Sequence, residues 1–219
     1  MSDRIMYQIT AMLSELLKNV NTEGRMFVGE AVDDFIDQIS EAGERGVSPE
    51  DSARGVQLAA DDMLQEAKTI NPEWPNVTCR NGCAHCCKMT VAITGHEAKQ
   101  LLQVARAKGL PIDTARLERQ SAYAEQTWQL QPEEDRACLF LGSDNTCQVY
   151  EDRPLSCRKY FVVSPPELCN IDKFPGHKTL VFVDAGIEIL TTAALTHSGC
   201  GFMPGMLLEA LDKEVSRGE

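Results

Sequence analysis

Four cysteines lie within nine residues, in the stretch C-R-N-G-C-A-H-C-C that runs from Cys79 to Cys87. A second group follows, and its members are Cys138, Cys147, Cys157 and Cys169. The total of nine cysteines is an odd number, which suits a complete disulfide framework poorly. Closely spaced thiolates are the ligands that zinc and iron–sulfur clusters use. The sequence therefore predicts a metal site, with the fold organised around it.

The first cysteine group contains a spacing that is typical of metal ligands. Cys83 and Cys86 are separated by two residues, so one tight turn at Gly82 can direct both sulfurs at one ion. Cys79 lies about one helical turn before Cys83. Adjacent side chains point in different directions, so we do not expect Cys86 and Cys87 to bind one small tetrahedral ion together. Three interpretations stay open: a polynuclear cluster, two metal centres, or one spare thiol.

The second cysteine group has turn signals beside its members. The Asp-Asn dipeptide at 144–145 predicts a turn that folds Cys138 and Cys147 onto neighbouring strands. Pro154 predicts the start of a helical turn that presents Cys157. We expect this group to complete a site of which the first group is one half.

Two arginines, Arg153 and Arg158, stand on either side of Cys157. Several thiolates around a divalent ion leave a site negatively charged, so nearby cations stabilise it. We expect both arginines to support the metal site in this way, as outer cofactor-binding residues. Acidic residues also lie close by in the sequence, and local ion pairs are therefore expected with Asp144, Glu151 and Asp152.

The cysteine pattern resembles the YkgJ / CxxCxxCC family, which is described as a zinc- or iron-chelating domain, and also as Fe–S cluster-containing or flagellin N-methylase-like. The resemblance covers about residues 79–169 and leaves the first 75 residues uncovered. It is carried by Cys79-x3-Cys83-x2-Cys86-Cys87, Cys138-x-Phe140-Leu141, Cys147-x2-Tyr150 and Arg153-Pro154-x2-Cys157-Arg158-x-Tyr160. It implies a cysteine-bound metal centre, and some members are linked to protein lysine methylation.

The predicted metal ligands are the cysteines that match this pattern, with Cys169 as the later cysteine that often follows it. They are Cys79, Cys83, Cys86, Cys87, Cys138, Cys147, Cys157 and Cys169. The predicted cofactor is an iron–sulfur cluster or zinc, in one multinuclear centre or in two. Cys200 stands apart between two glycines and is expected to be a buried free thiol. His85 is expected outside the ligand set, and no catalytic residue is assigned.

The hydrophobic periodicity predicts a mainly α-helical (α+β) fold. Residues 1–75 are expected to form an N-terminal region of amphipathic helices, packed on a cysteine-rich metal-binding domain at 76–219, with which it can form one unit. Helices are predicted at 3–20, 27–39, 49–70, 98–108, 113–128 and 205–215, and 187–195 is predicted to be a helix, with a strand as the alternative. Short strands are predicted at 91–93 and 179–183, and a turn at 199–201.

The chain is acidic, with a net charge of −12 that is concentrated at one end. The first 78 residues hold 6 lysines and arginines against 15 aspartates and glutamates. An acidic surface repels phosphate backbones, so nucleic-acid binding is not expected. Neither a membrane span nor a signal-peptide profile is evident, and a cytoplasmic location with reduced thiols is expected.

Three classes of function are compatible with the sequence, and the third of them is electron transfer by the metal centre. The first is a metal-binding protein whose centre serves an enzyme, such as an Fe–S-dependent oxidoreductase or a protein N-methylase-like enzyme with a protein substrate. The second is a non-catalytic adaptor or binding module whose zinc is structural. A closed site filled entirely by cysteines would favour the adaptor, and an apolar cleft beside the metal would favour the enzyme.

Overall fold

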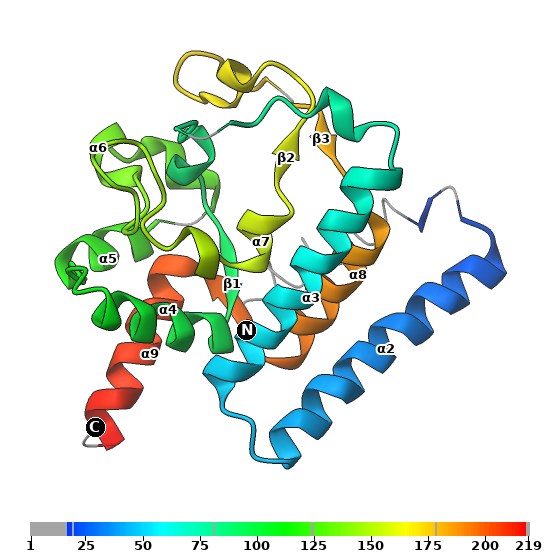
Figure 1. Ribbon diagram of the computed structural model, residues 1–219. Coiled ribbons are helices and arrows are strands. Elements are labelled where there is room, and N and C mark those ends of the chain that lie inside the picture. Colours follow the sequence, from blue (N-terminus) through cyan, green and yellow to red (C-terminus); the bar gives the residue numbers. More distant parts are fainter. Residues whose placement is uncertain (1–16, 19, 81, 124, 178, 218–219) are drawn as a thin grey trace.

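The computed structural model describes residues 17–217, apart from residues 19, 81, 124 and 178 (Figure 1). The helix predicted at 3–20 lies almost wholly outside the described residues. Within them, helices dominate and the strands are few and short, so the prediction of a mainly α-helical (α+β) fold is confirmed. No described helix has the length and apolar character that crossing a membrane requires.

Two long helices form the N-terminal part of the fold. Helix α2 spans Thr22–Glu44, and Asn21 caps it by accepting a hydrogen bond from the Gly24 amide. Helix α3 spans Pro49–Ile70 and begins as its sequence predicts, because Ser48 accepts from the Asp51 amide with proline at the first helical position. Both helices contact α8, Ala185–His197 (Figure 1).

The small core between these helices contains Ile39, Ala60, Leu155, Leu190 and Ala194. Helix α3 also contacts α4 (Gly95–Ala107) and the short helix α7 (Leu155–Arg158), both of which belong to the cysteine-rich part of the chain. The division into residues 1–75 and 76–219 stays a prediction.

The larger core lies between α4 (Gly95–Ala107), α5 (Thr114–Ser121) and α9 (Met203–Arg217). Its most deeply buried side chains include Ile93, Leu101, Leu102, Leu117, Phe140 and Leu207. A capping box begins α4, because the sequence places Thr94 three residues before Glu97: Thr94 Oγ1 accepts from the Glu97 amide, and the Glu97 carboxylate accepts from the Thr94 amide. The left-handed Gly109, with φ of 64°, follows the end of this helix.

The described strands form two antiparallel pairs. Strand β1 (Ala92–Thr94) pairs with β4 (Cys200–Phe202), and β2 (Phe161–Val162) pairs with β3 (Val181–Phe182). The turn predicted at 199–201 is therefore wrong, because Cys200 and Gly201 lie in β4 and only Gly199 takes a left-handed conformation. A Cβ atom at Gly201 would stand 2.6 Å from Met206 Sδ, so close packing of α9 is one reason for a glycine in this strand.

Short helices connect these elements. They are η1 (Trp74–Asn76), η2 (His85–Lys88), η3 (Glu125–Leu130), α6 (Glu133–Arg136), η4 (Tyr150–Asp152) and η5 (Pro166–Cys169). The helix predicted at 113–128 is too long, since α5 ends at Ser121. Trp128 in η3 instead donates from its indole nitrogen to the Lys88 carbonyl at 2.8 Å, which attaches this segment to the first cysteine group. The strand predicted at 179–183 is reduced to two residues.

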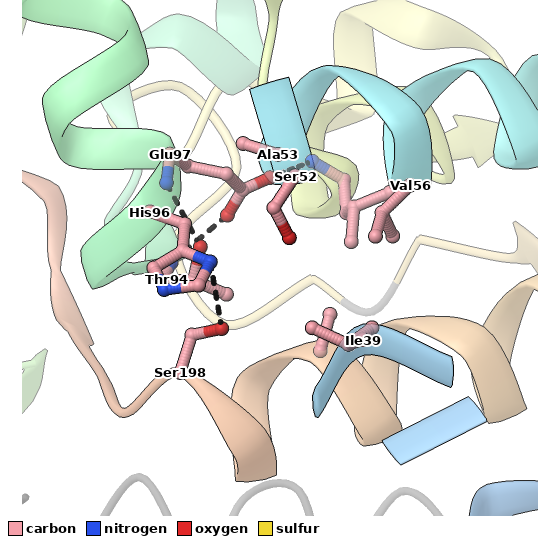
Figure 2. Close-up of a pocket in the computed structure, with 10 residues that line it drawn as sticks. Ile39, Ser52, Ala53, Val56, Thr94, His96, Glu97 and Ser198 are labelled. Carbon is pink, nitrogen blue, oxygen red and sulfur yellow. Dashed lines mark hydrogen bonds between the residues drawn. The ribbon is translucent and has the colours of Figure 1, made fainter. Parts of the chain in front are cut away.

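Residues of α2, α3 and α4, with Ser198 at the end of α8, meet around a cavity of about 10 Å³, which Figure 2 shows. The buried Glu97 carboxylate accepts from the Thr94 amide at 2.9 Å and from the Leu155 amide at 2.7 Å. His96 Nδ1 lies 3.3 Å from Ser198 Oγ. Because Leu155 is the first residue of α7, the Glu97 side chain fixes the start of the helix that presents Cys157.

Candidate metal centre

Eight cysteines line one cavity of about 1330 Å³, and they are the eight predicted ligands. All nine cysteines of the chain are free thiols. Cys200 does not line this cavity; it is buried beside Leu195 in a separate small cluster, as predicted for a free thiol. The cavity exceeds the roughly 300–1,000 Å³ of ordinary ligand pockets, so it has room for more than a single ion.

The first cysteine group is shaped by a turn and a short 3₁₀ helix. Gly82 has a φ of 80°, which allows the predicted turn, and the Cys83 amide donates to the Arg80 carbonyl at 3.1 Å. Cys86 and Cys87 follow in η2. A hydrogen bond with the Cys87 thiol, together with burial, raises the pKa of Cys86 far above its ordinary value.

Cys79 lies along strand β2 and outside any described helix, although the sequence placed it about one helical turn before Cys83. The Thr78 amide donates to the Val162 carbonyl at 2.9 Å, and the Val162 amide donates to Cys79 Sγ at 3.3 Å. Burial raises the pKa of Cys79, and this amide opposes the rise. A backbone N–H directed at a sulfur is the kind of support that metal-bound thiolates receive.

The loop from Cys138 to Cys147 folds back on itself as predicted. Asn145 adopts a left-handed φ of 61°, and Leu141 forms an antiparallel bridge with Cys147. The Cys138 amide donates to the Cys87 carbonyl at 2.7 Å, which joins the two cysteine groups through the backbone. Burial raises the pKa of Cys138 to about 11.

Helix α7 presents Cys157 to the cavity, and Pro154 caps its N-terminus in agreement with the sequence. The Cys157 amide donates to the Pro154 carbonyl at 2.9 Å. Burial is the main reason that the pKa of this thiol lies well above its ordinary value. Helix η5 places Cys169 in the cavity wall and contacts η2; burial, and next the charge of Cys79, raise its pKa to about 11.

The two predicted supporting arginines occupy different positions. Arg153 lines the cavity with its guanidinium 4.0 Å from the centre of the Tyr150 ring, and its charge opposes the rise in the pKa of Cys79, Cys86 and Cys147. Arg158 does not line the cavity. Its buried guanidinium binds Asp61 of α3 at 2.5 Å and the Arg153 carbonyl at 2.8 Å.

The ion pairs expected with Asp144, Glu151 and Asp152 are therefore not the ones that form around these cations. Arg158 pairs with Asp61, 97 residues away in the sequence, and contacts Glu151 only through its backbone carbonyl. Asp152 instead faces Arg54 and Lys108. Local proximity in the sequence is a weak guide here, because α3 packs against α7.

Sequence reasoning missed one ion pair in the cavity wall. Lys159 Nζ lies 2.5 Å from Glu188 Oε2, and both side chains are largely buried. The one available signal was Glu188 itself, the single carboxylate within the otherwise uncharged α8 sequence. Arg136 and Trp128 also line the cavity and were not singled out.

The donor set suits a thiophilic metal by its chemistry. All eight cysteines line the same cavity, and zinc and iron–sulfur clusters both accept thiolates alone. As the described side chains stand, no three Cys, His, Asp or Glu are grouped closely enough to hold one ion. Binding a single ion would require the cavity walls to approach one another. Because burial raises the pKa of Cys138, Cys157 and Cys169, metal binding at these thiols would also release protons.

The comparisons with known proteins agree with this donor set. Residues 78–174 match the model of the CxxCxxCC family, described as a putative zinc- or iron-chelating domain. Neither the curated proteins nor the solved structures gave a match. The matched segment contains every predicted ligand from Cys79 to Cys169. The resemblance seen in the sequence is confirmed, because residues 78–174 match the model of this zinc- or iron-chelating domain, which supports metal binding.

Proposed function

We propose that this protein uses a cysteine-ligated iron–sulfur or zinc centre in an enzyme that modifies a protein or another macromolecule, or that transfers electrons. The observation that carries the proposal is one large cavity bordered by all eight predicted ligands. When bound, an iron–sulfur cluster would supply electron transfer and zinc would supply a fixed positive charge. Cys79, Cys83, Cys86, Cys87, Cys138, Cys147, Cys157 and Cys169 are the residues proposed to hold the metal.

The remaining wall of the cavity supports an enzyme. Apolar side chains line it beside the cysteines, among them Trp128, Phe140, Leu195 and Met203. A purely structural zinc site is closed by its own ligands and needs no such space. Arg153 and the Lys159–Glu188 pair add charged groups to the same wall. An apolar space with a few polar groups is typical of sites that bind a substrate.

A protein substrate or partner fits the exposed surface of the N-terminal helices. Helix α2 exposes Met26 and Phe27, with relative exposures of 62% and 68%. Acidic side chains on the same helix are exposed as well, including Glu30, Asp33, Asp34 and Asp37. This surface would suit a partner that carries both apolar and basic groups. Nine free thiols suit a reducing compartment, and we propose the cytoplasm.

The decisive experiment is anaerobic purification, followed by metal and sulfide analysis and visible spectroscopy. A brown protein with iron and sulfide is the expected result. The matched control is Cys200→Ser, which removes the one cysteine outside the cavity and should leave the metal content unchanged. A colourless, metal-free chain with native helical content would refute the proposal.

The second candidate is a binding module with structural zinc. The thiol-only donor set favours it, since closed four-cysteine sites of this kind are common structural zinc sites. Stoichiometric zinc without colour, in a site that four cysteines close completely, would support this candidate over the first.

A further inference from the structure

The wall of the cysteine cavity is basic, although the chain as a whole is acidic. Four cationic side chains line the cavity, and they are Arg80, Arg136, Arg153 and Lys159. Glu188 is the one carboxylate among the described residues that line it. Because the net charge of the chain is −12, this excess of cations is local to the cavity. A basic wall inside an acidic molecule favours negatively charged groups in the space that it encloses.

Arg136 is the most deeply buried of these four cations. Arg80 is exposed and pairs with Glu167 at 3.1 Å, and Lys159 pairs with Glu188 at 2.5 Å. Arg136 is only 3% exposed, and its Nε and Nη1 atoms are buried without a hydrogen-bond partner among the described residues. Leaving a buried polar group without a partner costs free energy, so such groups call for an explanation. The unpartnered donors of Arg136 indicate an acceptor that the described part of the chain does not supply.

The one printed partner of this guanidinium lies outside the cavity wall. Arg136 Nη2 bonds to Asp172 Oδ1 at 2.5 Å. The Asp172 side chain is 37% exposed and does not line the cavity. Nε and Nη1 carry most of the N–H groups of a guanidinium, so the larger part of its donor capacity is left for another acceptor.

Helix α5 fixes the backbone on both sides of Arg136. Gln120 Nε2 donates to the Asp135 carbonyl at 2.5 Å and to the Ala137 carbonyl at 3.0 Å. Arg116 of the same helix also donates to the Ala137 carbonyl. The guanidinium is therefore held at the cavity wall before any ligand binds, which lowers the entropic cost of binding.

The rest of this part of the wall is apolar. Leu117 of α5, Trp128 of η3 and Phe140 line the cavity with Arg136. A hydrogen bond between charged groups is stronger in such surroundings than in water. Carboxylates and phosphates are the groups that a guanidinium binds best, because its planar set of donors matches their oxygens.

We propose that Arg136 binds an oxyanion group, a carboxylate or a phosphate, on the molecule that enters this cavity. The inference rests on the proposed function, since it takes the cavity as a substrate site, and it deepens that function by naming a chemical group of the substrate. The oxyanion supplies the acceptor that Nε and Nη1 lack, while Asp172 keeps Nη2. The apolar side chains of the wall contact the uncharged remainder of the substrate.

The test is isothermal titration calorimetry of the anaerobically purified protein at low ionic strength. Sodium phosphate and sodium acetate are the two probes, and sodium chloride is the reference for nonspecific binding. Arg136→Met should weaken binding of the preferred anion by about tenfold or more, because hydrogen bonds to charged groups are strong. Asp172→Asn frees Nη2 and removes a partly exposed negative charge, so it should tighten binding by about two- to fivefold. Arg80→Met is the matched control: it removes an exposed cation of the same wall and should keep the wild-type affinity.

Each outcome supports or overturns the inference. A response to phosphate alone or to acetate alone supports it and identifies the group. Metal-loaded wild-type protein that binds neither anion more tightly than chloride overturns it. Metal content should be unchanged in Arg136→Met, and a loss of metal would overturn the inference by assigning this charge to the metal centre.

Failure of the proposed function looks different, because a folded wild-type chain without metal refutes that function whatever the anions do. If Arg136→Met does not fold, Asp172→Asn decides, since this variant keeps the guanidinium. Tighter anion binding in Asp172→Asn supports the inference, and equal or weaker binding overturns it.

Discussion

Two interior sites of this molecule contrast sharply, although both are lined by groups that can form polar interactions. The site around Glu97 in Figure 2 encloses about 10 Å³, and its buried carboxylate accepts two backbone hydrogen bonds. Nearby, Gln57 and Gln100 bond to each other reciprocally at 2.7 and 2.9 Å. The cysteine cavity encloses about 1330 Å³ and is lined by eight thiols, which are weak hydrogen-bonding groups.

The comparison separates buried polar groups whose hydrogen bonds are made within the chain from buried thiols whose binding partner would be a metal. Buried polar groups that are satisfied within the chain fix a unique arrangement of helices. Thiols lining a wide cavity contribute little to folding until a metal binds them, and the binding free energy then becomes folding free energy. The helical part around Glu97 should therefore be stable without metal, and the cavity walls should depend on it.

Metal removal should produce the largest effect, and it tests most directly whether the cysteine cavity depends on metal while the region around Glu97 does not. Apparent binding free energies of structural zinc sites are about 10–16 kcal/mol, so the cavity walls should loosen markedly when metal is removed. Hydrogen exchange with and without a chelator should show faster exchange at 79–169, and little change in α3. Equal loss of protection in both regions would show that they fold as one metal-dependent unit.

The connection between the two regions can be broken at Asp61. Replacing Asp61 by Asn leaves the Arg158 guanidinium, which is 4% exposed, without its ion pair. We expect a loss of about 2 kcal/mol in the free energy of unfolding, below the roughly 3–5 kcal/mol of fully buried pairs, because Asp61 is 36% exposed. Urea denaturation measures the change.

The matched control for Asp61→Asn is Glu41→Gln, which breaks an ion pair with Arg45 on the surface of α2. Exposed pairs contribute about 0.2–1 kcal/mol, so this variant should remain close to the wild type. Equal effects of the two substitutions would mean that the Asp61–Arg158 pair is no more than a surface contact.

The capping box at the start of α4 allows a smaller test in the helical region around Glu97, which should be stable without metal. Thr94→Ala should lower the free energy of unfolding by about 1 kcal/mol, because the Glu97 amide loses the acceptor on Thr94. Thr94→Ser keeps a hydroxyl acceptor and should recover most of the loss. Metal content should be unchanged in both variants, and a matching drop in metal would contradict the separation of the two regions.

The smallest effect should come from His96. Burial, followed by the charges of His197 and Lys99, holds the pKa of His96 below its ordinary 6.5, and Glu50 acts in the opposite direction. Below about pH 6.5 the unfolded chain therefore binds more protons at this residue than the folded chain. The free energy of unfolding should decrease as the pH is lowered from about 6.5 to the pKa of His96 in the folded chain. Unfolding free energies of wild type and His96→Gln between about pH 5 and 7 should show a shallower slope in the variant. An identical slope would exclude His96 as the source.

Features that depend on a few neighbouring residues could be predicted from the sequence. Ser48-Pro49, the Thr94–Glu97 capping box and Pro154 each begin a helix where their local chemistry indicates. The density of the eight predicted ligands in the sequence indicated a common role, and in the structure all eight line one cavity. Their ligation of metal stays a prediction.

Features that depend on partners far along the chain could not be predicted. Cys200 and Gly201 look like a turn because of the flanking glycines, but they pair with β1 from more than a hundred residues earlier. The partners of Arg158 and Lys159 lie on α3 and α8, and no local pattern encodes them.

The ion pair between Asp61 and Arg158 has a thermodynamic consequence beyond stability. It attaches α3 to the helix that presents Cys157, and Glu97 holds the opposite end of that helix. A molecule that binds the N-terminal helices and displaces α3 would therefore change the affinity for metal. By reciprocity, metal would change the affinity for that molecule by the same factor. The affinity of the N-terminal helices for other molecules would then depend on whether metal occupies the cavity, although these helices lie outside the family match.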